Sequence, residues 1–265
     1  MQVASTASRR EQLTMLIWGK PACGKTILAA TAPGKKLFLQ FDPGGTASLA
    51  RSDNILVADY SGMAPKEIAT LKQGTIVESD LTKLIKEQNV STVILDSLTS
   101  LGQIALTYAI QSGKANGRNF VATLEQPGLT GYGIRSAILL DICAMVLRVC
   151  SDTKAHCIFI AHDKETLDDD GKVAEISVAL GGQGQTAVPA KINEIWHMED
   201  TGRERLIYVR SFGVKRPMRT RMFELGAKDV RFTWKYNQVD KTGDTLAKYY
   251  EAWEANGFER IAIPT

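Results

Sequence analysis

The chain has 265 residues, of which 44% are hydrophobic and 23% are charged, and this composition allows one large α/β domain with a sizeable core. The formal net charge of +3 is too small to indicate nucleic-acid binding by itself. The four cysteines form neither a CxxC pair nor a Cys/His cluster, which argues against a zinc site and indicates reduced thiols in a cytosol.

The N-terminal segment at 1–12 lacks the apolar core of a signal peptide and predicts a flexible tail. The most apolar stretch, at 133–150, is interrupted by Arg135, Asp141 and Arg148, so no run reaches the ~18 residues of a membrane span. We therefore expect a cytoplasmic protein that makes no contact with a membrane.

A phosphate-binding loop is predicted directly after the first strand. An apolar run at 13–18 precedes the sequence GKPACGKT at 19–26, and a helix-like run follows at 27–32. Strand, glycine-bracketed loop and helix are the context in which this motif binds nucleotides.

The residue types in this loop fit the chemistry of a nucleotide. Gly19 and Gly24 permit a tight turn that aims several N–H groups at one phosphate chain. Lys25 is expected to reach the β- and γ-phosphates, and the Thr26 hydroxyl to coordinate Mg²⁺. Cys23 is interpreted as a small loop-filling residue, with a redox-sensitive thiol as the alternative. The predicted nucleotide-binding residues are Gly19, Lys20, Pro21, Ala22, Cys23, Gly24, Lys25, Thr26 and Ile27.

Apolar runs and helical spacing predict the remaining elements in chain order. Further strands are expected at 36–41, 55–60, 92–95 and 156–161, and helices at 79–89, 98–111, 133–150 and 243–256. Long loops are expected at 112–131 and 163–187, and two strands joined by a hairpin turn at 194–199 and 205–212. This order predicts an α/β fold with a mainly parallel sheet, flanking helices and antiparallel C-terminal strands.

Polar residues stand where three of these strands end, at the edge of the sheet where such folds bind ligands. Asp42 and Asp96 are the two candidate carboxylates for the metal shell. A metal role for Asp42 would suggest a GTPase, but no Asn-Lys-x-Asp segment is present to read guanine. If Asp96 serves the metal, another strand is inserted between the two motif strands, and Asp42 is free to act as the general base. A turn role for Asp42 and a helix N-cap role for Asp96 remain open.

These residues resemble the RecA-type ATPases. The segment TVILDSLTSL at 92–101 is similar to their metal-binding strand, and IFIAH at 158–162 to the strand whose last polar residue senses the γ-phosphate. Tyr132-Gly133, the glycine-rich run at 181–184 and the basic stretch near 205–221 resemble phage-encoded RecA-core proteins, including single-strand annealing proteins of the Sak type. The resemblance covers residues 13–223, with 224–265 as a C-terminal extension containing a helix.

The resemblance implies an ATP- and Mg²⁺-dependent ATPase that acts on single-stranded DNA in viral recombination or replication and is stimulated by DNA. Asp42 stands where the family places its catalytic carboxylate, usually a glutamate, and His162 would be the γ-phosphate sensor, with a core or cap role as the alternative. The implied catalytic residues are Asp42, Lys25 and His162, and the implied metal residues are Thr26 and Asp96.

The resemblance also implies partners. The loops at 112–131 and 163–187 would face DNA, with Lys114, Arg118 and Phe120 as contacts, unless they are only solvated loop residues. The acidic run at 168–170 argues against contact between that tip and phosphates. A homo-oligomeric ring or filament is expected, and a single-strand-binding or replication protein is a further candidate partner. The candidates for a residue acting in trans are Lys215, Arg216, Arg219 and Arg221, unless they form an ordinary basic strand face.

Two alternatives remain open at this stage. Lys20 after Gly19, and Asp42-Pro43 after the second strand, resemble the deviant-loop partition ATPases, which use that early lysine in trans. The residues Pro21-Ala22, and the missing proline–glycine turn after Asp96, argue against them. The other alternative is a nucleotide-binding scaffold with little turnover.

Overall fold

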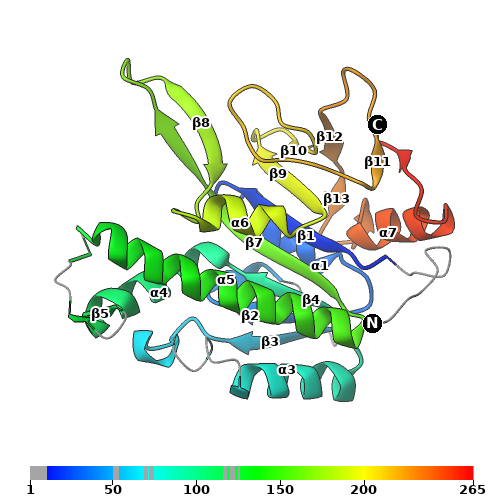
Figure 1. Cartoon of the computed structure of the whole chain (residues 1–265). Helices are drawn as coiled ribbons and strands as arrows, with labels where there is room; N and C mark the ends of the chain where they lie inside the picture. The colour runs from blue at the N-terminus through cyan, green and yellow to red at the C-terminus, as the bar shows by residue number, and fades with distance from the viewer. Residues whose placement is uncertain are drawn as a thin grey trace, which may run out of the picture.

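The structure of the chain is a computed structural model, and it describes residues 11–264 except 50–53, 69–70, 72–74, 116–117, 120–122 and 125. Most of the described chain forms one layered α/β unit (Figure 1). None of the helices in the described ranges is both long and apolar enough to cross a membrane.

A twisted sheet forms the centre of the described chain, with the strand order β12-β10-β9-β1-β7-β4-β2-β3 and β8 paired to β7. Its parallel strands are β1 (Thr14–Gly19), β2 (Lys35–Gln40), β3 (Ile55–Asp59), β4 (Val90–Asp96), β7 (His156–Leu167) and β9 (Glu194–Asp200). The antiparallel strands are β8 (Val173–Val178), β10 (Arg205–Tyr208) and β12 (Arg231–Trp234). The predicted α/β class, with a mainly parallel sheet and antiparallel C-terminal strands, is confirmed.

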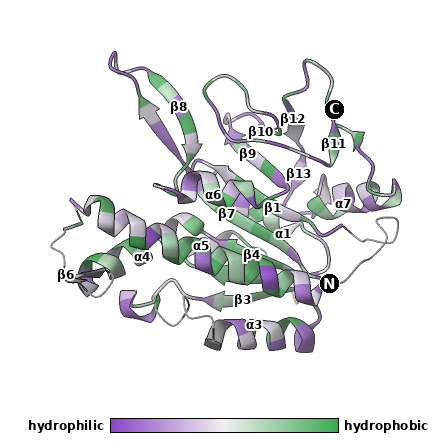
Figure 2. Ribbon diagram, viewed as in Figure 1, coloured by the Kyte–Doolittle hydropathy of each residue, from purple (hydrophilic) through white to green (hydrophobic). Residues whose placement is uncertain are grey.

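The middle strands are apolar because helices cover both of their faces. β1 and the first half of β7 are buried almost residue by residue, and Figure 2 shows that the strands in the middle of the sheet are largely hydrophobic. Such continuous apolar runs are typical of parallel strands covered on both sides. β7 lies between β1 and β4, so a strand separates the phosphate-loop strand from the strand of Asp96.

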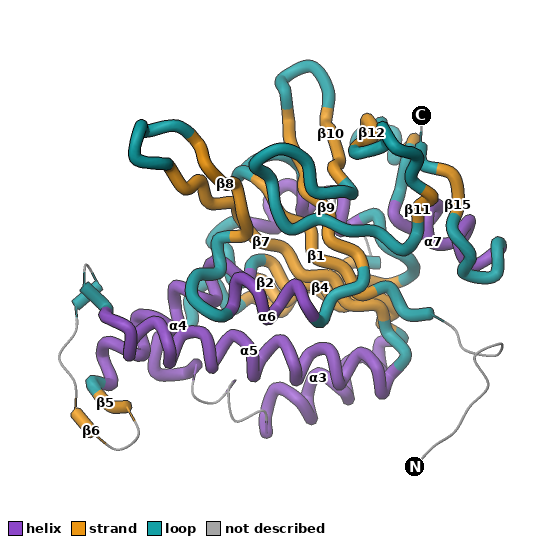
Figure 3. Tube along the Cα trace, turned by 45° about the horizontal axis from the view of Figure 1, so that its top comes forward, coloured by secondary structure: helices purple, strands orange, loops and turns teal. Residues whose placement is uncertain are grey.

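Helices pack on both faces of the sheet and form two apolar cores (Figures 1 and 3). One face carries α3 (Thr75–Gln88), α4 (Leu98–Ser112), α5 (Gly128–Thr153) and α6 (Gly184–Ala190). The other carries α1 (Lys25–Ala30) and α7 (Leu246–Ala255). α7 contributes Leu246, Tyr250 and Trp253 to the second core, which attaches the C-terminal segment firmly to the sheet.

Short elements complete the chain. They are the 3₁₀ turns η2 (Gly45–Ser48) and η3 (Pro65–Glu67), and the two-residue strands β5 (Lys114–Ala115), β6 (Arg118–Asn119), β11 (Phe223–Glu224), β13 (Tyr236–Asn237), β14 (Thr242–Gly243) and β15 (Ile261–Ala262). β5 pairs with β6, β11 with β15, and β13 with β14.

Both predicted long loops contain regular structure, so these two predictions are wrong. Within 112–131, β5 and β6 pair in a small hairpin, and α5 begins at Gly128. Within 163–187, β7 continues to Leu167 and forms an antiparallel hairpin with β8, and α6 begins at Gly184. In the second segment the outer part of the hairpin, at 164–174, is exposed and mostly polar, so a period-two apolar pattern extends over only a few residues.

The predicted strand at 205–212 is also shorter than expected, because β10 ends at Tyr208. The basic segment after it folds back under β9. There the buried Glu194 carboxylate accepts hydrogen bonds from the Trp196 indole (2.9 Å), the Thr220 hydroxyl (2.6 Å) and the main-chain N–H groups of Arg221 and Met222. The segment is therefore held by this buried acceptor and by isolated β-bridges from Arg219 to Ile195 and from Lys215 to Ile176, rather than by a continuous strand ladder.

Candidate functional site

The carboxyl edge of the sheet brings the predicted loop and the two carboxylates together. β1 and β7 are in register so that Gly19 lies beside His162, and β2 and β4 are in register so that Gln40 lies beside Asp96. Asp42 follows β2 by two residues. Strand ends that meet at one edge are where such sheets bind ligands.

The loop itself requires its two glycines. A Cβ at Gly19 would lie 2.1 Å from the Met198 main-chain oxygen, and the φ of Gly19 is +151°. Gly24 has a φ of +100° and precedes α1 directly. Both positions therefore exclude larger residues, one by close approach to β9 and the other by its left-handed backbone.

Lys25 is folded over its own loop. It is 4% exposed, and its ammonium donates to the carbonyls of Gly19 (2.9 Å) and Lys20 (2.6 Å). These are exchangeable contacts, because an ammonium with three donors can turn to a phosphate that enters the loop. Cys23 is 2% exposed and burial raises the pKa of its thiol, so it fills the loop and is not a reactive thiolate.

Thr26 and Asp96 meet across the intervening strand. The Thr26 hydroxyl donates to Asp96 Oδ2 at 2.7 Å. Asp96 is 2% exposed, and burial raises the pKa of its carboxyl to about 6 although this hydrogen bond opposes the rise. A hydroxyl and a carboxylate beside a phosphate site are the oxygen ligands that Mg²⁺ takes together with phosphates and water.

The donor set fits Mg²⁺ and not a self-sufficient metal cage. Among the described residues, no group of three or more His, Cys, Asp or Glu side chains is arranged to hold a metal. Thr26 would bind the ion and Asp96 would orient its shell, while the nucleotide completes the coordination. When bound, the ion neutralises phosphate charge.

Asp42 is held by three side chains. Ser97 Oγ donates to Asp42 Oδ1 at 2.9 Å, Ser100 Oγ donates to the same oxygen, and His162 Nε2 lies 3.5 Å from Asp42 Oδ2. Burial alone would raise the pKa of Asp42, but the hydrogen bonds from His162, Ser100 and Ser97 outweigh it and lower the pKa. Asp42 is therefore an ionised carboxylate at neutral pH, with a side chain that is 20% exposed.

The main chain around Asp42 is also fixed. The Gln40 amide donates to the Asp42 carbonyl at 2.6 Å, and Gly45 N–H donates to the same carbonyl at 3.1 Å. A Cβ at Gly45 would lie 2.0 Å from Gln40 Nε2, which explains this glycine. The main chain of Asp42 thus forms a turn, while its carboxylate remains available to other partners. A turn role and a role in the site are therefore compatible for this residue.

Three hydroxyl residues of this site were missed by the sequence reasoning. Ser97 is the N-cap of α4 and accepts from Ser100 N–H at 3.2 Å, so Asp96 is not the cap that was considered. Thr99 accepts from His162 N–H at 2.9 Å. The hydroxyl-rich run directly after Asp96 was the available signal, since such residues gather at helix N-termini.

Arg205 was also missed. A Cβ at Gly24 would lie 3.3 Å from Arg205 Nε, so this side chain from β10 lies beside the phosphate loop. Its guanidinium is 3.4 Å from Asp200 and 5.8 Å from the centre of the Trp234 ring. Nothing in the local sequence distinguishes Arg205 from its basic neighbours, because only the pairing of β10 with β9 brings it to the loop.

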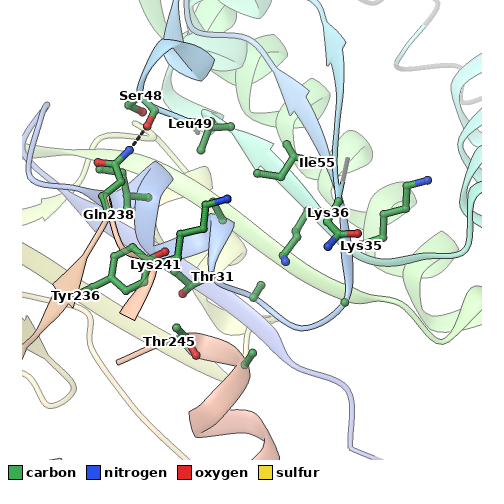
Figure 4. A pocket seen from close by; sticks show the side chains of 16 residues that line it. Thr31, Lys35, Lys36, Ser48, Leu49, Ile55, Tyr236, Gln238, Lys241 and Thr245 are labelled. Carbon is green, nitrogen blue, oxygen red and sulfur yellow. Dashed lines mark hydrogen bonds between the residues drawn. The ribbon is translucent and has the colours of Figure 1, made fainter. Parts of the chain in front are cut away.

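A cavity of about 530 Å³ lies between the C-terminal half of α1 and the starts of β2 and β3, away from the phosphate loop at 19–26. Figure 4 shows Thr31, Lys36, Tyr236 and Lys241 gathered around it, with a hydrogen bond from the Gln238 amide to the Ser48 carbonyl. Three lysines line this cavity and no acidic side chain does. Burial lowers the pKa of Lys36. The cavity therefore suits a ligand with polar acceptors and some aromatic surface.

Lys20 forms an ion pair with a side chain of β7. Its ammonium is 3.0 Å from Glu165 on β7, and its side chain is 69% exposed. The hydrogen bond with Glu165 raises the pKa of Lys20. An exposed pair of this kind contributes little stability, so Lys20 can leave it for another partner.

Two of the four predicted trans residues are engaged within the chain. Lys215 is paired with Glu199 and lies 4.0 Å from the centre of the Tyr208 ring, and Arg219 donates to the carbonyls of Pro189 and Ile192. The guanidinium groups of Arg216 and Arg221 are exposed and have no hydrogen-bond or ion-pair partner among the described residues. A role in trans for any of them remains a prediction.

The predicted DNA contacts lie in or beyond the small hairpin. Lys114 is in β5 and Arg118 is in β6, on antiparallel strands in which Lys114 pairs with Asn119. Phe120 lies outside the described residues. Their roles remain predictions.

Comparisons with known proteins bear on this geometry. The model of a family described as "AAA domain" matches residues 11–222. A KaiC-like protein from the hyperthermophilic archaeon Pyrococcus horikoshii OT3 is similar in structure, with 12% sequence identity, a TM-score of 0.46, and 85% of this chain and 86% of that chain covered. No curated protein matches the chain.

The close approach of β1 to β9 generates a stability prediction. Gly19→Ala forces a Cβ against the Met198 carbonyl and should lower the free energy of unfolding by about 1–3 kcal/mol, the usual range for overpacking. Urea denaturation followed by circular dichroism measures it. Gly62→Ala is the matched control, because no atom lies within 4 Å of its Cβ position, and should change the free energy by less than about 0.5 kcal/mol. Equal stabilities of the two variants would contradict the assigned packing.

Proposed function

The chain belongs to the AAA domain family of P-loop ATPases, and from this premise we propose that it binds ATP with Mg²⁺ and hydrolyses it at the carboxyl edge of the sheet. The observation that carries the proposal is the pair of carboxylates in different environments. Asp96 is buried and bonded to the loop residue Thr26, whereas Asp42 is ionised and held by hydroxyl groups and His162. Two carboxylates with separated pKa values serve different roles.

In this mechanism the phosphates lie in the loop at 19–26. Lys25 releases the carbonyls of Gly19 and Lys20 and binds the β- and γ-phosphates. Thr26 and Asp96 hold Mg²⁺ and the water molecules around it.

Asp42 orients the attacking water and accepts its proton. Ser97 and Ser100 fix one oxygen of the carboxylate, which leaves the other, beside His162, to face a water molecule. His162 lies beside Gly19 in the β1–β7 pair, and from this position its imidazole can respond to the γ-phosphate. The shorter aspartate serves in place of the usual glutamate because its main-chain N–H donates to the Asp96 carbonyl at the end of β4 (3.3 Å), while Gln40 and Gly45 hold its own carbonyl.

The finer part of the proposal concerns the partner. We infer that the protein acts on single-stranded DNA as a homo-oligomeric, RecA-like ATPase of the phage Sak type, in the host cytoplasm, with a single-strand-binding or replication protein as a further partner. Its support is the motif resemblance together with the β7–β8 hairpin, which extends from the strand that carries His162 (Figure 1). The acidic tip at 168–170 would repel phosphates, so we expect no phosphate contact there.

The first test of nucleotide binding removes Lys25. Lys25→Ala should weaken binding of a fluorescent ATP analogue by at least about 100-fold, which is about 2.8 kcal/mol at 1.4 kcal/mol per decade. The control is Lys66→Ala, an exposed lysine in η3, which should bind as the wild type does. Retained affinity in Lys25→Ala would refute the assigned phosphate site.

A second test separates binding from hydrolysis. Asp42→Asn keeps the shape of the side chain but cannot accept the proton, so Mg·ATP binding should persist while turnover falls by about 100- to 10,000-fold, the range for a general base. Steady-state phosphate release and a nucleotide titration measure the two quantities. The control, Asp59→Asn at the exposed end of β3, should leave both unchanged. Unchanged turnover in Asp42→Asn would reduce Asp42 to a turn residue.

The partition ATPases remain a second candidate because Lys20 is exposed and held only by a surface ion pair. The two candidates differ for Lys20→Ala. A trans-acting lysine predicts that this variant binds ATP but does not hydrolyse it. The function proposed above instead predicts turnover within about five-fold of the wild type, because a surface pair is worth at most about 1 kcal/mol. Phosphate release decides between them, and loss of turnover would favour the partition ATPases.

A further inference from the structure

Arg135 in α5 is a half-buried arginine that has no hydrogen-bond or ion-pair partner among the described residues. Its Nε is buried and donates to no acceptor among the described residues. No described residue forms an ion pair with its guanidinium. Burial lowers the pKa of Arg135, and this effect is opposed by Tyr132 but by no carboxylate. A positive charge removed from water without a partner costs free energy, which a bound anion would recover.

Glycines make the space for this guanidinium. A Cβ at Gly102 on α4 would lie 3.1 Å from Arg135 Nε, and a Cβ at Gly181 would lie 2.8 Å from one of its terminal nitrogens. Gly181 and Gly182 have φ values of +65° and +51°, so the turn after β8 presents bare backbone to the arginine. Any larger side chain at Gly102 or Gly181 would displace the guanidinium.

The elements that surround Arg135 also lead to the proposed general base. Ser97, the N-cap of α4, and Ser100 in its first turn donate hydrogen bonds to Asp42. Gly102 lies on the same helix, two residues after Ser100. The turn at Gly181 follows β8, and Ala179 N–H donates to the His162 carbonyl at 2.8 Å. Figures 1 and 3 show α4, α5 and α6 side by side on this face. A ligand on Arg135 would therefore be linked to α4, whose first turn includes Ser100, and to the turn that is hydrogen-bonded to the His162 main chain.

An aromatic surface accompanies the charge. Tyr132 is one helical turn before Arg135, on the same side of α5, and is 41% exposed. Arginine and an exposed aromatic ring are the pair that binds the phosphate and the base of a single strand. A free phosphate ion would use the arginine but not the ring.

We propose that Arg135 binds one phosphodiester of single-stranded DNA and, through Gly102 and Gly181, connects DNA to the elements that position Asp42. This inference rests on the proposed function. It assigns DNA stimulation of the ATPase to contacts on α4 and on the turn after β8. Arg135 acts as a binding residue toward DNA and as a positioning residue toward Asp42.

The experiment compares Arg135→Gln with the wild type and with Arg148→Gln. Arg148 is on the same helix, but it is exposed and paired with Glu78 at 2.6 Å, which makes it a matched control. Binding of a fluorescent oligo-dT is measured by anisotropy over a series of salt concentrations, and phosphate release is measured with and without oligo-dT. Thermal unfolding confirms that each variant folds.

For Arg135→Gln we expect an oligo-dT affinity about ten-fold lower and a salt slope smaller by about 0.7, the value for one phosphate contact on a single strand. The ratio of phosphate-release rates with and without oligo-dT should fall toward one. Arg148→Gln should behave as the wild type does. If Arg135→Gln does not fold, Arg135→Lys should keep the salt slope and lose a few-fold in affinity, because lysine lacks the planar fork.

The outcomes separate the inference from the function on which it rests. A wild type that does not bind oligo-dT refutes both the DNA part of the proposed function and this inference. A wild type that binds, with Arg135→Gln equal to it in affinity, salt slope and stimulation, overturns only the inference. Unchanged affinity in Arg135→Lys, where the glutamine variant does not fold, overturns it as well.

Discussion

The hydrogen bond between Thr26 and Asp96 is the interaction on which the site depends, because it joins the helix after β1 to the end of β4, which is not a neighbour of β1. β7 lies between β1 and β4, so the two residues meet only where all three strands end at the same edge. The parallel pairing of β1 with β7 ends at His162, which therefore lies at the same edge. α4 also starts directly after Asp96, which delivers Ser97 and Ser100 to Asp42.

The electrostatics follow from this packing. Asp96 lies in the interior, where burial raises its pKa to about 6, and a carboxylate in such a place is best satisfied by a cation beside it. Asp42 lies nearer to solvent, and its hydroxyl and imidazole neighbours lower its pKa. The same edge of the sheet thus holds one carboxylate suited to a metal shell and one suited to accept a proton.

Much of the fold and the centre of the site were predictable from local patterns. The glycine-bracketed loop, the apolar strands and the position of Asp96 at a strand end all have signals within a few residues. The partners of Asp42 were not predictable in this way, because Ser100 is 58 residues away and reaches it only through the pairing of β2 with β4. The β7–β8 hairpin was mistaken for a loop because its outer part is polar and exposed, and the apolar alternation in β8 extends over only a few residues. Arg205 and Arg135 owe their surroundings to strand pairing and to glycines on other elements, which a linear pattern does not show.

The most direct measurement is a crystal structure of the protein with Mg²⁺ and a non-hydrolysable ATP analogue. We expect Mg²⁺ to be coordinated by the Thr26 hydroxyl, Lys25 to bind the β- and γ-phosphates, and a water molecule to lie between the γ-phosphate and Asp42. A water molecule held by a different residue, with Asp42 still bonded only to Ser97, Ser100 and His162, would contradict the assignment of the general base.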